Sequence, residues 1–428
     1  MRVLSFTLAG FGLATAATAS PAVTFHKDVL PVLQKNCQNC HRPGEAAPMS
    51  FLDYQHTRPW AKAMKTAVLS KQMPPWFADA HYGKFSNAPG MTQREADIIA
   101  TWADSGAKEG NPKDAPAPLT FAEGWQIGKP DFIIEMPTAF SVPEAGTIAY
   151  QYVVIPTGFT EDKWVQMAEA RPGNKEVVHH IIAFVRDKGN PWLKDAKPGV
   201  PFVPARNGGG LADTVAGYAP GMVPSQLKPG QAKLMRAGSD IILQLHYTAT
   251  GKSATDRSRI GLIFATEPPK ERVVSLAAGT QNFVIPAGDP NYEVVSKIKL
   301  QHETMLVNLL PHMHFRGKDF EYRAVYPTGE KETLLSVPRY DFNWQLTYRL
   351  DEQKLLPAGT VIECTAHFDN SANNKYNPDP TKEVRFGEQT WEEMMFGFFD
   401  VAIPADMNPM DLFRPRKPAA AQQTGAGL

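Results

Sequence analysis

Cys37, Cys40 and His41 are the residues whose types and spacing point most directly to chemistry, because they fit the pattern C-x-x-C-H. On one helical turn, two thiols three residues apart face the same way and can add to the two vinyl groups of a haem. The following imidazole can then bind the iron. A redox dithiol would follow a strand in a βαβ pattern, and a zinc site would need a second cysteine pair. The motif therefore predicts one covalently attached haem c.

The segments around this motif predict a small helical domain over residues 22–110. An apolar helical face leads into the motif, and Thr92 and Glu95 form a capping box that opens a helix over residues 96–103. This arrangement resembles a small class I-like cytochrome c.

In that family a methionine before the C-terminal helix is the sixth iron ligand. Met73 fits this place best, because the two prolines after it stiffen the loop and fix the thioether. Met49 and Met91 are the competing candidates, and most methionines only fill cores.

Five histidines of the C-terminal part lie in or beside apolar stretches: His179, His180, His246, His312 and His314. So many imidazoles are difficult to bury in the neutral form without partners. The i, i+2 spacing of the last two places both rings on one face of a strand. Two methionines, Met394 and Met395, follow later in the chain. Imidazoles together with a thioether suit copper, because sulfur stabilises Cu(I) and nitrogen serves both oxidation states.

These segments resemble the type II copper, ascorbate-dependent monooxygenases, a family that includes peptidylglycine α-hydroxylating monooxygenase and dopamine β-monooxygenase. The resemblance covers residues 129–405 and rests on four motifs in the same order and at comparable intervals: His179-His180, Gln244-Leu245-His246-Tyr247, the run from Pro311 to Lys318, and Glu392-Glu393-Met394. The family has two jelly-roll β-sandwiches, each binding one copper ion, with a solvent-filled cleft between them.

Carried over position by position, the resemblance implies two copper sites. His179, His180 and His246 would hold an electron-transfer copper. His312, His314 and Met394 would hold the oxygen-activating copper and form the catalytic site, with Met395 as the alternative to Met394.

Two departures from the family concern the substrate. Peptidylglycine enzymes bind substrate with an arginine two residues before the His-x-His pair and a tyrosine four residues after the methionine, where this chain has Leu310 and Phe398. We therefore expect a small apolar or aromatic substrate rather than a peptide carboxylate.

Short strands must position the copper-type residues. Alternating stretches at 132–135, 150–155, 241–247 and 360–368 are separated by Pro, Gly and Asp, which is typical of β-sandwiches. Cys364 lies on the apolar face of the last stretch, and we expect a buried free thiol there. His367, on the other face, is expected to be exposed.

The chain of 428 residues has room for several domains. The sequence predicts a mixed multidomain fold, with a small all-α cytochrome c domain followed by two all-β jelly-roll sandwich domains. The predicted parts are a signal peptide (1–19), the cytochrome c-like domain (22–110), a linker (111–128), two sandwiches (129–278 and 279–415) and a disordered tail (416–428).

The charge balance and the N-terminus restrict location and partners. Lys plus Arg equals Asp plus Glu at 44 each, which gives no electrostatic signal for nucleic acid or for an anionic membrane surface. Arg2, a short apolar run and Ala17-Thr18-Ala19 predict a signal peptide, hence a periplasmic or secreted protein, and no later stretch is long enough for a membrane span.

These features lead to a functional hypothesis: a copper-dependent monooxygenase that hydroxylates a C–H bond with O2, with electrons delivered through the fused haem. An external electron donor, such as ascorbate, would be replaced or supplemented by that haem. The alternative is a haem and copper electron-transfer or copper-binding protein without hydroxylase activity. A third possibility is a non-catalytic chain that uses its sandwiches for adhesion.

Overall fold

The computed structural model describes residues 22–45, 47–121, 124–204 and 213–415, which form two compact units. The helical unit comprises residues 22–42, 49–72 and 91–119, and the sandwich unit comprises residues 43–48, 73–90 and 120–415. The predicted signal peptide (1–19) and C-terminal tail (416–428) lie outside the described residues. The division after Leu119 falls within the predicted linker, 111–128.

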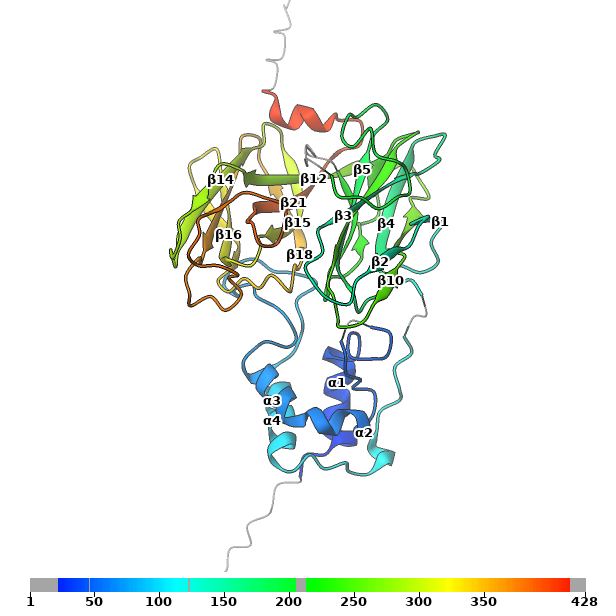
Figure 1. Ribbon diagram of the computed structural model, residues 1–428, viewed down its shortest axis with the longest axis vertical. Helices are drawn as coiled ribbons and strands as arrows, with labels where there is room; N and C mark the ends of the chain where they lie inside the picture. Colours follow the sequence, from blue (N-terminus) through cyan, green and yellow to red (C-terminus); the bar gives the residue numbers. More distant parts are fainter. Residues whose placement is uncertain (1–21, 46, 122–123, 205–212, 416–428) are drawn as a thin grey trace, which may run out of the picture. The chain divides into compact units, whose positions relative to one another are not determined.

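The helices are short and most of them belong to the helical unit (Figure 1). They are the π-helical turn η1 (Phe25–Val29), α1 (Leu30–Asn36), α2 (Tyr54–Thr57), the 3-10 turn η2 (Arg58–Trp60), α3 (Ala61–Leu69), α4 (Gln93–Asp104) and the 3-10 turn η3 (Pro112–Asp114). A further 3-10 turn, η4 (Pro409–Phe413), ends the sandwich unit.

The predicted capping box at the start of α4 is confirmed. The Thr92 hydroxyl accepts the Glu95 N–H at 3.3 Å, and the Glu95 carboxylate accepts the Thr92 N–H at 2.7 Å. Two otherwise unpaired donors of the first turn are thereby satisfied. The helix buries Ile99 and Trp102 against Phe25, so that the core of the helical unit gathers around α1, α3 and α4.

The first sandwich packs two sheets around one core. One sheet has the order β3 (Gln151–Pro156), β9 (Asp240–Tyr247), β5 (Val178–Arg186), β6 (Thr214–Tyr218). The other contains β1 (Phe132–Glu135), β11 (Arg259–Phe264), β4 (Lys163–Arg171) and β8 (Gln231–Met235), with β7 (Ser225–Gln226) beside β4. The short pair β2 (Phe140–Val142) and β10 (Ala254–Asp256) lies apart from both sheets.

The second sandwich is built in the same way around its own core. One sheet contains β12 (Glu271–Thr280), β21 (Met395–Pro404), β15 (Thr304–His312) and β18 (Tyr348–Leu356). The other has the order β14 (Tyr292–Lys299), β19 (Val361–Phe368), β16 (Gly317–Val325), β17 (Lys331–Val337). A short pair, β13 (Val284–Ile285) and β20 (Val384–Arg385), completes it.

One sheet runs through both sandwiches. β12 pairs with β8 in parallel, Glu271 opposite Gln231, and this pairing joins the two halves into a nine-stranded sheet. The predicted boundary at 278/279 therefore falls inside β12. The chain changes sandwich between β11 and β12, because β12 pairs along its whole length with β21 of the second sandwich.

Residues 73–90, which the predicted cytochrome c-like domain (22–110) included, belong instead to the sandwich unit. Phe77 lies in the core of the second sandwich, and the Asp79 N–H donates to Ser336 O at 2.8 Å. Trp76 and Phe85 both pack edge-on against Tyr348. Aromatic side chains in a loop need apolar cover, and here the second sandwich provides it.

The four stretches predicted as strands are confirmed as β1, β3, β9 and β19. Cys364 is a free thiol with no exposed surface, as predicted, and buried positions alternate with partly buried ones along β19. His367 is only partly exposed, and its Nδ1 lies 2.6 Å from Asp319 Oδ1. No helix in the described ranges is long and apolar enough to cross a membrane.

Candidate metal and haem sites

His179, His180 and His246 converge on one point in the first sandwich. Ring nitrogens of the three residues lie within 4.8 Å of one another. The Nδ1 atoms of His179 and His180 are 3.4 Å apart. Two nitrogens that bind one metal ion at about 2.0 Å each, with an angle near that of trigonal or tetrahedral geometry, lie about 3.3 Å apart. The spacing is therefore that of ligands to one ion.

A β-bulge makes this convergence possible. Neighbouring residues of a regular strand point to opposite faces of the sheet, so His179 and His180 should not meet. The β5–β9 register shifts between Val178 and His180: Val178 faces Tyr247 and His180 faces His246. His179 is the extra residue, and the bulge turns its ring toward the other two histidines.

The rings of this group also have buried nitrogens that no hydrogen bond satisfies. His179 Nε2, His180 Nε2 and His246 Nδ1 are buried and have no hydrogen-bond partner. Burial lowers the pKa of His179 to about 4 and that of His246 to about 3, and it lowers the pKa of His180 well below its usual value. All three rings are thus neutral near pH 7, which is the form that binds metals. Tyr150 packs its ring against His180 and His246.

The second group lies where β15 ends. His312 is the last residue of β15 and His314 follows beyond it, with ring centroids 5.3 Å apart. Met313, between them, points into the core of the second sandwich, so the predicted alternation continues past the end of the strand. His312 Nδ1 lies 2.8 Å from Gln345 Oε1. That contact leaves Nε2 as the free coordinating nitrogen of His312.

His314 also has one nitrogen engaged and one free. Its Nδ1 lies 3.2 Å from the carbonyl oxygen of Glu392, whereas its buried Nε2 has no partner. Burial lowers the pKa of His312 to about 4 and that of His314 well below the usual value. Both rings are therefore neutral, as a metal ligand requires.

The structure separates the two candidate methionines. Met394, just before β21, is half-buried and lines a cavity together with His312. Met395 is fully buried in the core of the second sandwich. A thioether in the core is far less suited to reach a shared ion, so Met394 is the residue whose position suits the predicted ligand role.

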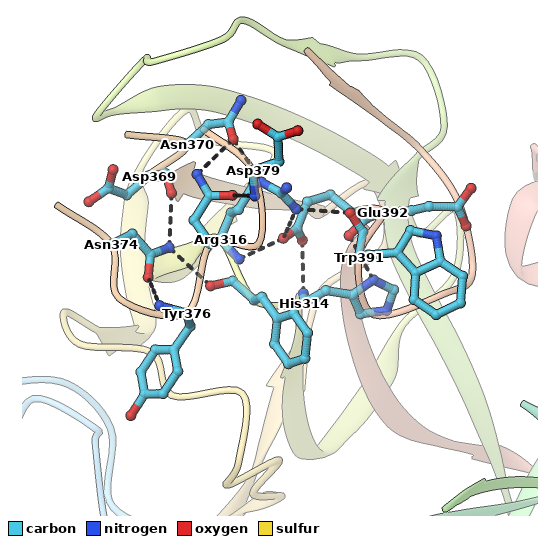
Figure 2. Close-up of polar contacts among 12 residues, drawn as sticks. His314, Arg316, Asp369, Asn370, Asn374, Tyr376, Asp379, Trp391 and Glu392 are labelled. Atoms are coloured by element: carbon cyan, nitrogen blue, oxygen red, sulfur yellow. Dashed lines mark hydrogen bonds and ion pairs between the residues drawn. The ribbon is translucent and has the colours of Figure 1, made fainter. Parts of the chain in front are cut away.

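A buried carboxylate links the segments of His314 and Met394. Glu393 has no exposed surface, and its oxygens accept the backbone N–H groups of His314 at 2.9 Å and Arg316 at 2.6 Å. Burial raises the pKa of Glu393 to about 8, against the lowering effect of these hydrogen bonds and of one from the Met394 backbone. Figure 2 shows the surrounding network, in which Arg316 reaches Asn370 and the backbone of Trp391.

Phe342 lies between the two histidine groups. Its ring stacks on His179 with centroids 5.2 Å apart and meets His314 edge-on at 6.0 Å. Only 7% of Phe342 is exposed. Along the line from His179 to His314, this aromatic ring lies between the two groups.

A cavity of ≈ 170 Å³ opens beside the second group. Seven aromatic side chains contribute to its wall: Tyr150, Tyr152, Phe184, Trp192, Phe386, Phe396 and Phe398. At its polar end the Tyr152 hydroxyl donates to Glu388 at 3.2 Å, and Gln244 hydrogen-bonds to the same hydroxyl. Burial raises the pKa of Glu388 to about 7. Leu310 and Phe398 face each other across β15 and β21, and Leu310 lines a second cavity of ≈ 160 Å³.

The C-x-x-C-H motif forms a turn at the end of α1. The N–H groups of Cys40 and His41 both bond to the Cys37 carbonyl, at 3.1 and 2.9 Å. Neither cysteine is part of a disulfide; Cys37 is half-buried and Cys40 is exposed. The His41 ring stacks on Phe51, and its buried Nδ1 has no partner. Two thiols and an imidazole presented from one turn fit covalent haem attachment.

The structure does not bring Met73 into the unit that holds this motif. Met73 opens the segment 73–90 of the sandwich unit, whereas Met49 and Met91 pack against the core of the helical unit. Burial lowers the pKa of His41, and a backbone hydrogen bond with Met49 opposes part of this lowering. Of the three candidates for the distal ligand, Met49 and Met91 therefore share a unit with the motif.

Sequence reasoning missed several residues that complete these sites. Phe342 and Gln345 lie in an irregular segment with no motif, so nothing in the sequence signals their contacts. Arg316 and Glu393 are different, because both lie within the quoted motifs. Arg316 lies two positions after His314 and Glu393 directly precedes Met394, and a charged residue so close to a predicted buried ligand is a signal for a buried ionic contact.

Comparisons with known proteins add no identification. No family model matches the chain, and no curated protein matches it. Among solved structures, the VP2 subviral particle of infectious bursal disease virus is 8% identical to this chain. The match covers 66% of this chain and 74% of the VP2 chain, with a TM-score of 0.20. The tandem CBM22 domains of Paenibacillus barcinonensis Xyn10C are 10% identical, with coverages of 68% and 96% and a TM-score of 0.13. Scores of this size carry no argument about function.

Proposed function

We propose that this protein is a copper-dependent monooxygenase that hydroxylates a C–H bond of a small organic substrate with O2. One observation carries the proposal: His312 and Met394, an imidazole and a thioether, line one cavity beside the buried His314. Three neutral histidines in the neighbouring sandwich supply a second ligand set. Two ligand sets are what a two-electron oxygenation needs when each ion stores one electron.

The overall reaction converts R–H, O2, two electrons and two protons into R–OH and water. Copper bound at these positions would supply one-electron steps and activate O2. The chain itself would hold the ligands and exclude water: Gln345 orients the His312 ring, the Glu392 carbonyl orients the His314 ring, and Phe342 occupies the space between the groups.

The cavity favours a substrate of limited size. Its volume of ≈ 170 Å³ is close to that of an apolar cavity of about 150 Å³ that accommodates a benzene molecule. Its wall is largely aromatic. A small apolar or single-ring substrate fits this space.

The haem c proposed for Cys37, Cys40 and His41 would deliver the electrons. A carrier tethered to its acceptor in one chain has a high effective concentration there. Stopped-flow mixing of protein with reduced haem and Cu(II) tests this step. Haem oxidation should keep pace with copper reduction, and haem that stays reduced while copper remains Cu(II) would rule it out.

Metal analysis of the purified full chain tests the proposal as a whole. We expect two copper ions and one haem per chain, and oxygen uptake that depends on an added substrate from a panel of small aromatic compounds. The tight spacing of His179, His180 and His246 alone would suit a copper and haem electron-transfer protein. One copper per chain without substrate-dependent oxygen uptake would favour that function.

A further inference from the structure

The His314 and Met394 segments are joined through the side chain of Glu393. His314 follows β15, and Met394 precedes β21, so neither ligand lies within a strand. One oxygen of Glu393 accepts the His314 N–H and the other accepts the Arg316 N–H. Because Glu393 directly precedes Met394, this carboxylate fixes the backbone of one ligand segment against that of the other.

Arg316 ties a third segment to the same point (Figure 2). Only 2% of this arginine is exposed. Its Nε donates to Asn370 Oδ1 at 2.8 Å, and one terminal nitrogen donates to the Trp391 carbonyl at 3.0 Å. The same nitrogen lies 3.9 Å from Glu393. The guanidinium therefore holds the chain just before Met394.

Asn370 anchors this arrangement to the sandwich. It has no exposed surface, and its amide nitrogen donates to the carbonyl oxygens of Pro286 and Lys382 at 2.8 and 2.9 Å. Its oxygen accepts from Asn377 as well as from Arg316. Each polar group of the side chain is thus satisfied, and Arg316 has one position in which to bind.

Stability alone does not account for such a network. Burying an arginine and a glutamate costs desolvation energy that their attraction only partly offsets, and apolar side chains of similar volume are often as stabilising. The network does, however, fix the separation of two loop segments. Metal ligands outside regular strands need outer partners of this kind to hold their geometry.

We propose that Glu393, supported by Arg316, is a positioning residue that holds His314 and Met394 at the spacing needed to bind one copper ion. The proposal rests on the proposed function, since it assumes that these two residues are ligands. Neither Glu393 nor Arg316 would touch copper, substrate or O2.

Glu393→Gln tests the proposal in the full-length, copper-loaded protein. The amide keeps one acceptor oxygen and turns an N–H group toward the second backbone donor, so one of the two clamps is lost. We expect copper affinity at the methionine site to fall by about 10–100-fold. X-ray absorption of the Cu(I) protein should lose its copper–sulfur scattering. Affinity at the three-histidine site should not change.

Glu169→Gln is the matched control. Glu169 is 4% exposed, accepts the backbone N–H groups of Gln126 and Ile127, and lies 3.0 Å from Arg171. It is therefore a clamp of the same chemistry that holds no predicted ligand. This variant should keep both copper affinities and the copper–sulfur signal, whatever its effect on the melting temperature.

The outcomes separate the two proposals. Wild-type protein without copper–sulfur scattering would contradict the proposed function itself. Wild-type protein with that scattering, together with Glu393→Gln of unchanged affinity and scattering, would overturn the positioning role. If Glu393→Gln does not fold, Arg316→Lys replaces it, because the single ammonium group of lysine cannot take the place of the two guanidinium nitrogens that donate to Asn370 and Trp391. A loss of copper affinity at the methionine site alone would support the positioning role. Unchanged copper affinity at both sites would overturn it.

Discussion

The two histidine groups are built in different ways. His180 and His246 face each other in the β5–β9 ladder, with His179 on a bulge in the same strand. His314 and Met394 both lie outside strands and are held by hydrogen bonds to Glu392 and Glu393. Backbone pairing positions the first group and His312 of the second, whereas buried side chains position His314 and Met394. A site of the first kind should tolerate changes around it better than a site of the second kind.

The difference suits the roles proposed for the two sites. An electron-transfer ion benefits from ligands that do not move between oxidation states. A site that must admit O2 and substrate needs an open side, and the cavity beside His312 and Met394 provides one. Loops can leave a side open more easily than a ladder can, at the cost of needing support from outer residues.

His246→Ala should have the largest effect. It removes one of three ligands, and the ladder offers no substitute. We expect one copper ion per chain in place of two, with substrate-dependent oxygen uptake lowered more than about 100-fold. Copper analysis and oxygen uptake measure this, with His367→Ala as the control. Retention of both ions would show that the three-histidine group is not a copper site.

Met394→Leu and Met395→Leu form a matched pair with a smaller expected effect. Leucine at 394 removes the sulfur from the cavity and should weaken Cu(I) binding by about 10–100-fold. Leucine at 395 conserves core volume, so it should cost less than about 1.5 kcal/mol of stability and leave copper binding intact. Competition with a chromophoric Cu(I) chelator compares the two. The reverse order of affinities would assign the ligand role to Met395.

Glu388, which lines the cavity beside His312 and Met394, should make the stability of the protein depend on pH. Burial raises its pKa from 4.5 to about 7, so the folded state binds more protons than the unfolded state between these values. This contribution is fully present below pH 4.5 and is lost as the pH rises through 7. Because Glu388 is partly exposed, we expect about 1 kcal/mol. Urea unfolding of copper-free wild type and Glu388→Gln at pH 5 and pH 8 should show that wild type loses about 1 kcal/mol more stability, or gains about 1 kcal/mol less, than the variant over this interval. Equal pH dependence in both would contradict it.

Tyr150→Phe and Tyr152→Phe should show the smallest effects. The Tyr150 hydroxyl is buried without a partner, so its removal should leave stability unchanged or raise it by up to about 1 kcal/mol. The Tyr152 hydroxyl bonds to Glu388 and Gln244, and its loss should cost about 1 kcal/mol. Thermal unfolding of the two variants gives the comparison. A larger loss for Tyr150→Phe would mean that its hydroxyl has a partner.

Local patterns in the sequence predicted the strands and the α4 cap, because alternation and capping depend on neighbouring residues alone. The position of Cys364 followed from the same alternation. The bulge at His179 could not be predicted in this way. It depends on the pairing of β5 with β9, some 60 residues further along the chain, and short-range patterns do not encode that register.

Where the structure differs from the predicted domain bounds, long-range packing is the reason. Residues 73–90 follow the haem motif in the chain, and sequence proximity assigned them to the helical domain. Their aromatic residues instead pack on the second sandwich, beyond residue 330. The partners of the candidate ligands, such as Phe342 and Gln345, come from irregular segments whose contacts only the folded chain defines.

The parallel pairing of β8 with β12 has a consequence for unfolding. Because both sandwiches share one sheet, unfolding of one sandwich exposes backbone groups and apolar surface of the other. The two sandwiches should therefore melt together, in one cooperative transition, although each has its own core. An ion bound in either sandwich would then raise the melting temperature of both, because ligand binding to the native state stabilises the whole cooperative unit.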